Sequence, residues 1–60
     1  MAAELQVSDR QKIFLKIVHM QDEGVRVDES RNQIAAEFGI DVDQVHEIES
    51  EGLTRNWPPL

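Results

Sequence analysis

The stretch Ser30–Leu53, SRNQIAAEFGIDVDQVHEIESEGL, decides the fold. Ile34 and Phe38 are four residues apart, so they share one face of a helix that ends before Gly39. A glycine at this position closes a helix in the left-handed conformation without a Cβ penalty. Asp41 then serves as an N-cap, with a glutamine three residues later as in a capping box. The pattern predicts two helices joined by a tight turn.

The small and apolar residues of this stretch have the spacing of a helix-turn-helix. Such a unit needs a small residue for close packing, a glycine at the bend, an apolar residue in the turn and two anchors under the second helix. Here these residues are Ala35, Gly39, Ile40, Val45 and Ile48. We therefore predict a helix-turn-helix, and the plainer alternative is a three-helix bundle without a recognition helix.

The flanking residues predict one more helix and an anchored tail. Before the stretch, one apolar stripe indicates a buried helical face, and Ser8 is its expected N-cap. That stripe comprises Ile13, Phe14, Ile17 and Val18. After it, Leu53 and Trp57 are expected to reach the core, while Pro58 and Pro59 keep the tail extended.

These signals together predict an all-α fold in a single domain over residues 1–60. The expected helices lie at about 9–22, 30–38 and 42–51. Asp28 or Ser30 is the expected cap of the second helix, and Ser30, with Gln33 three residues on, forms the better capping box. A chain this short buries only about 60% of its unfolded surface, so we expect modest stability.

Composition excludes several classes of protein. There is no cysteine, hence no disulfide framework and no thiolate metal site, as is usual in a reducing compartment. No apolar run is long enough to cross a membrane, and the N-terminus has no signal-peptide pattern. We expect a cytoplasmic protein without membrane association.

The net charge is −6, and residues 41–53 contain five acids and no Lys or Arg. That balance disfavours tight phosphate binding.

Residues 30–53 resemble the last region of bacterial sigma factors, region four, which reads the upstream promoter element. The matching positions are Ser30, Ile34, Phe38, Ile40, Val45, the pair Ile48-Glu49 and Leu53. Val7-Ser8, Arg10 and Phe14-Leu15 are similar to the preceding helix of that family, so the resemblance covers about three quarters of the chain. It implies a three-helix arrangement and a role in transcription.

The sequence departs from that family where the family contacts DNA. Several arginines of the family's third helix correspond here to Val42, Gln44 and His46. Asp43 matches a family glutamate that can accept a hydrogen bond from a cytosine amino group, and Glu47 matches a polar residue. These five residues, together with Arg31, are the candidate contacts to DNA or to a protein partner.

The expected function is DNA binding in the manner of region four, which the resemblance implies. An alternative function remains open. The acidic third helix instead favours a protein-protein interaction module, which docks on a basic patch of the transcription machinery or imitates nucleic acid. A solvated face that keeps a small protein soluble is the simplest interpretation of the same acids.

Catalysis and cofactor binding have no support in the sequence. There is no cysteine, no glycine-rich phosphate loop and no nucleophile beside an orienting base. Asp43 and His46 lack further convergent ligands for a metal, and a calcium loop would need glutamate where Gly52 stands. We expect no enzyme and no cofactor. The expected assembly is a monomer, or a weak homodimer through Leu15 and Met20.

Overall fold

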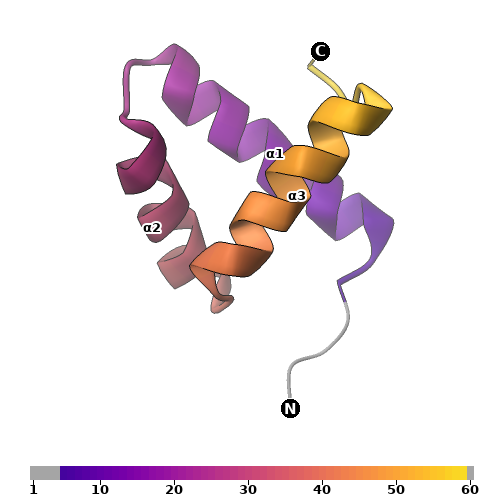
Figure 1. Cartoon of the computed structure of the whole chain (residues 1–60), viewed down its shortest axis with the longest axis horizontal. Coiled ribbons are helices and arrows are strands. Elements are labelled where there is room, and N and C mark those ends of the chain that lie inside the picture. The colour runs from indigo at the N-terminus through magenta and orange to yellow at the C-terminus, as the bar shows by residue number, and fades with distance from the viewer. Residues whose placement is uncertain (1–4, 60) are drawn as a thin grey trace.

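Three α-helices form the fold in the computed structural model, which describes residues 5–59. They are α1 (Val7–Asp22), α2 (Val27–Phe38) and α3 (Val42–Arg55). In Figure 1, α3 crosses in front of α1, and α2 lies along one side of the pair. Each helix contacts the other two. The described residues contain no strand, so the predicted all-α class is confirmed.

The core lies where the three helices meet. The predicted stripe of α1 supplies three of its eight buried apolar residues, because Phe14 and two isoleucines of that helix are fully buried. The buried apolar residues are Ile13, Phe14, Ile17, Ile34, Ala35, Val45, Ile48 and Trp57. Leu5, Val18, Met20 and Ile40 are partly buried against them. The two anchors predicted for the last helix, Val45 and Ile48, are therefore confirmed.

The connection between α2 and α3 follows the sequence closely. Gly39 has a φ of 66°, so it adopts the left-handed conformation that ends α2. The backbone N–H of Ile40 then donates to the carbonyl of Ala35 at 3.0 Å. Asp41 and Gln44 form the predicted capping box, in which the Asp41 N–H donates to Gln44 Oε1 at 3.2 Å. Local backbone chemistry thus accounts for the whole turn.

The first two helices begin earlier than predicted. α1 follows Gln6 and α2 follows Arg26, both extended and neither providing a side-chain cap. Ser8 and Ser30 consequently lie inside the helices. Ser30 is fully buried, and its Oγ donates to the Val27 carbonyl at 2.7 Å, a bond within the first turn of α2. The prediction that Ser30 caps α2 was wrong, because its buried hydroxyl donates to the Val27 carbonyl and accepts a hydrogen bond from Gln21 of α1.

The third helix ends at Arg55, whereas the prediction ended it at about residue 51, before a glycine that was expected to weaken its end. Gly52 is buried, and a Cβ there would lie 2.6 Å from Phe14 Cγ and closer to two other ring carbons. Glycine is therefore required by the α1–α3 contact and does not end the helix. Asn56, with a φ of 53°, ends it in the left-handed conformation. Trp57 returns to the core as predicted, and its backbone N–H donates to the Gly52 carbonyl at 3.0 Å.

Two of the apolar residues at the surface are Leu53, which was expected to reach the core, and Phe38, which was expected to share a helix face with Ile34. Leu53 is 61% exposed and Phe38 is 40% exposed. The Phe38 ring instead lies 5.9 Å from the Lys16 ammonium nitrogen. Of the two anchors expected after the stretch, only Trp57 reaches the core, with its ring edge-on to Phe14 at a centroid distance of 6.0 Å. Pro58 and Pro59, expected to be extended, lie in a turn.

Candidate partner-binding surface of the third helix

The third helix has one buried face and one exposed face. Val45, Ile48 and Gly52 pack inward. On the opposite side the exposed residues recur at helical spacing and form a single surface, here called the outward face of α3. It comprises Val42, Asp43, His46, Glu47, Ser50, Leu53 and Thr54. This face is available to a partner because nothing else in residues 5–59 covers it.

Glu49 does not belong to the outward face, because it joins three helices. Its side chain is only 12% exposed, and its Oε1 accepts a hydrogen bond from Arg31 Nε of α2 at 2.5 Å. Gln21 Nε2 of α1 donates to the other carboxylate oxygen at 3.3 Å and to Ser30 Oγ at 3.2 Å. We refer to these four residues as the polar junction. It holds the relative positions of the helices.

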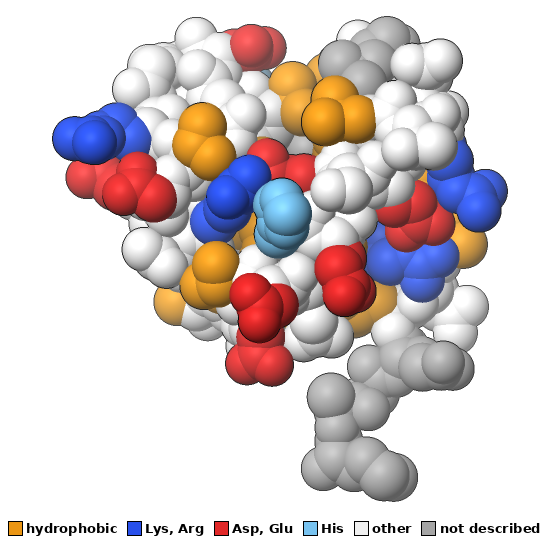
Figure 2. Space-filling view, viewed as in Figure 1, with side chains coloured by type: hydrophobic (Ala, Val, Ile, Leu, Met, Phe, Trp, Pro, Cys, Tyr) orange, Lys and Arg blue, Asp and Glu red, His pale blue; other side chains and the backbone are white. Residues whose placement is uncertain are grey.

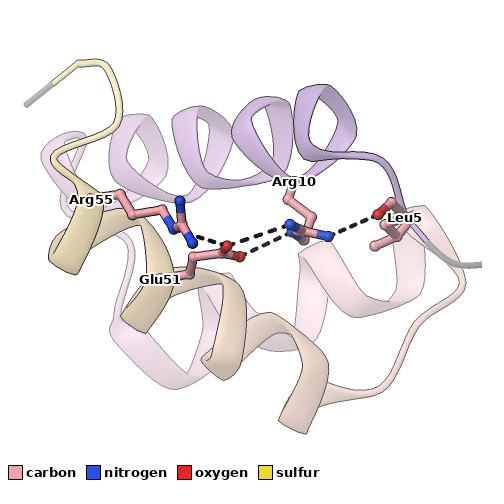
Figure 3. A network of polar contacts seen from close by, with 4 residues as sticks. All are labelled: Leu5, Arg10, Glu51 and Arg55. Carbon is pink, nitrogen blue, oxygen red and sulfur yellow. Dashed lines mark hydrogen bonds and ion pairs between the residues drawn. The ribbon is translucent and has the colours of Figure 1, made fainter.

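Glu51 is likewise engaged within the molecule. Arg10 Nε of α1 donates to its Oε1 at 3.0 Å, and Arg55 Nε lies 3.3 Å from its Oε2 (Figure 3). Arg10 also donates through Nη1 to the Leu5 carbonyl at 2.9 Å. The network ties the start of the described chain to the end of α3. Two of the five acids in residues 41–53 therefore have structural partners, and a third, Asp41, caps α3.

Most of the basic side chains are neutralised in the same way. The chain has six Lys and Arg residues, and five of them form ion pairs. These five are Arg10, Lys16, Arg26, Arg31 and Arg55. The Arg26–Asp28 pair is long, at 3.8 Å, and well exposed, so it is weak. Within residues 5–59, Lys12 is the cation that makes no ion pair.

The structure brings together four of the six predicted contact residues. Val42, Asp43, His46 and Glu47 all lie on the outward face of α3. Gln44 instead completes the cap of its own helix, and Arg31 completes the polar junction. Leu53 was missed as a surface residue, although its spacing of seven from His46 places both on the same side of the helix.

The charge on this side of the molecule is mixed. Figure 2, seen with α3 in front, shows acidic and basic side chains beside one another and no continuous basic area. Asp43 and Glu47 make no ion pair with any other described residue. The exposed half of α3 thus presents uncompensated carboxylates together with the apolar side chains of Val42 and Leu53. A phosphate backbone would be repelled here, whereas a basic and partly apolar surface would be attracted.

Two further observations concern other kinds of site. No group of three or more His, Cys, Asp or Glu side chains in residues 5–59 is arranged to hold a metal ion. Within the same residues, no helix is both long and apolar enough to cross a bilayer.

Comparison with known proteins supplies no relative. No protein-family model matches the sequence, and no curated protein or solved structure matches it either. Its own residues and geometry must therefore carry any functional argument.

Proposed function

We propose that this chain is a small cytoplasmic helix-turn-helix protein, associated with transcription, that binds a basic protein surface through the outward face of α3. The connection between α2 and α3 supports the helix-turn-helix assignment. It combines the left-handed Gly39, the buried Ala35 and the partly buried Ile40 with a capped second helix. The role in transcription rests on the resemblance to region four of sigma factors.

The state of the cations favours protein over DNA as the partner. Affinity for DNA comes largely from Lys and Arg side chains that neutralise phosphates and release counterions. Here five of six such side chains already form ion pairs within the molecule, and none lies on the outward face of α3. Direct reading of base edges also depends mainly on Arg, Lys, Asn and Gln. Among the predicted contact residues of α3, only Gln44 is of these types, and it is occupied as a cap.

Capture of partners by immobilised protein tests this proposal. The wild type is compared with Asp43→Asn/Glu47→Gln, which removes two charges from the outward face. The matched control is Asp22→Asn/Glu29→Gln, which removes two exposed carboxylates that make no ion pair with a described residue. We expect a basic partner to be retained by the wild type and the control and to be lost from the outward-face variant. Identical retention by all three proteins would overturn the proposal.

DNA binding in the manner of region four is the second candidate, and the α2–α3 connection is the observation that favours it. A titration of promoter-like and random duplexes at low salt decides between the two. Binding of the wild type below about 50 micromolar, weakening as salt rises, would establish this second function. We expect no such binding.

A further inference from the structure

A shallow hollow lies on the outer side of α1. It has a volume of about 370 Å³ and is lined by Lys12, Leu15, Lys16 and His19. These residues are spaced by three, four and seven positions, so they form one exposed side of the helix. Leu15 is 48% exposed and supplies the apolar part of the lining. The hollow is separate from the outward face of α3, which belongs to another helix.

The positive charges around this hollow favour binding of an acidic partner. Lys12 makes no ion pair with any described residue. Lys16 pairs with Glu37 of α2, but its side chain remains 47% exposed. A carboxylate placed beside Lys12, with an apolar side chain over Leu15, would therefore satisfy both features of the surface.

We propose that the α1 hollow binds the outward face of α3 of a second copy of the chain. This inference rests on the proposed function, because it names a partner for that face. Lys12 and Lys16 are one helical turn apart, and so are Asp43 and Glu47. Four residues of helix span about 6 Å in both cases. Two helices packed side by side can thus align both carboxylates with both ammonium groups. Val42 is 41% exposed and precedes Asp43 at the start of the outward face, so it offers an apolar side chain to Leu15.

Charge also excludes the two symmetric alternatives. Packing α1 on α1 would place lysine against lysine, and packing α3 on α3 would place carboxylate against carboxylate. The complementary contact joins two different surfaces, so a pair of molecules keeps one hollow and one outward face free. Such head-to-tail contacts produce open chains or rings rather than a closed dimer. Exposed ion pairs contribute little each, and every copy carries a net charge of −6, so the association is weak.

Sedimentation equilibrium at up to about 1 mM protein tests the proposal at physiological salt, where charges are screened beyond about 8 Å. Lys12→Glu disables the hollow, and Asp43→Arg/Glu47→Arg disables the outward face. We expect the average mass of the wild type to rise with concentration, and each variant alone to remain a monomer. An equimolar mixture of the two variants should associate again, because each supplies the native surface that the other lacks and the two charge-reversed surfaces also complement each other.

The control is Asp22→Arg/Glu29→Arg, which changes the net charge by the same amount as the outward-face variant but replaces no lining residue of the hollow and no residue of the outward face. It should associate at least as strongly as the wild type, because its overall repulsion is lower. Leu15→Ser is a second hollow variant and should also remain a monomer. Circular dichroism confirms that each variant is folded.

A wild type that stays monomeric at about 1 mM would overturn the self-association. So would a mixture without heterodimer, or an outward-face variant that associates as the control does. A monomeric chain that still captures a basic partner through Asp43 and Glu47 would defeat this inference and leave the proposed function intact. Duplex binding by the wild type would defeat the proposed function.

Discussion

At the scale of single residues, Gly52 and Phe14 set how closely α1 and α3 approach. Gly52 is buried in α3 with the Phe14 ring against its Cα, and Trp57 meets the same ring edge-on. Glycine is a poor helix former, costing about 1 kcal/mol relative to alanine. The cost is offset because any side chain at position 52 would displace Phe14, the largest fully buried side chain of the core.

Gly52→Ala is therefore predicted to destabilise the protein although alanine favours helices. Overpacking a core costs about 1–3 kcal/mol, and the improved propensity offsets about 1 kcal/mol of it. The expected net loss is about 1–2 kcal/mol, or about 5–10 °C in Tm for a domain of this size. Thermal unfolding followed by circular dichroism measures it, with the exposed Ser50→Ala as the control. A rise in Tm for Gly52→Ala would mean that Phe14 does not fill this space.

At the scale of helices, the polar junction fixes how the three elements meet. Glu49 follows the exposed Glu47 by two residues, yet its carboxylate lies among α1, α2 and α3. Removing its charge would leave Arg31 without its partner and weaken the hydrogen bond from Gln21. The neighbouring Glu47 is exposed and makes no such contact with a described residue.

Replacing glutamate by glutamine should consequently change the free energy of unfolding by different amounts at positions 49 and 47. Glu49→Gln is predicted to lower the free energy of unfolding by about 1–2 kcal/mol, since hydrogen bonds to charged groups contribute about that much. Glu47→Gln should change it by no more than about 0.5 kcal/mol, as expected for an exposed side chain. Urea denaturation of both variants measures the difference. Equal effects would show that the junction does not hold the helices.

The capping box of α3 gives a further prediction at this scale. Asp41→Ala removes the side chain that accepts from the first turn and should cost about 1 kcal/mol. Glu47→Ala, further along the same helix, is the control and should be nearly neutral. Urea denaturation again provides the measurement. Equal stability of Asp41→Ala and the wild type would show that the box does not stabilise α3.

The sequence predicted the elements whose signals are local. The stop at Gly39, the Asp41–Gln44 cap and the buried stripe of α1 depend on neighbours in the chain, and all were confirmed. The start of α2 and the end of α3 were wrong because Ser30 and Gly52 serve tertiary contacts. A serine inside a junction and a serine at a cap have the same letter pattern.

The candidate site could be predicted only in part for the same reason. Five acids in residues 41–53 look equivalent in the sequence. Which of them are neutralised depends on where Arg10 and Arg31 come to lie, and those residues are 41 and 18 positions away from their partners. Pairing across such separations is set by the packing of helices and has no local signature. Four predicted contact residues still lie together because they share one helix.

At the scale of the whole molecule, the fold and the charge distribution support different conclusions about function. The connection between α2 and α3 has the features of a helix-turn-helix, whereas the cations that such a fold uses on DNA are engaged internally. We propose that charge, and not shape, keeps α3 from DNA. If so, supplying cations on the outward face should be sufficient to create DNA binding.

The direct test is a fluorescence anisotropy titration of a random duplex at about 20 mM salt with the wild type and with Asp43→Arg/Glu47→Arg. We predict that the variant binds in the micromolar range and that its affinity falls with salt, with a log–log slope of about −2 for two new phosphate contacts. The wild type should show no binding at about 50 micromolar. Equal binding by the two proteins, or none by the folded variant, would contradict the claim.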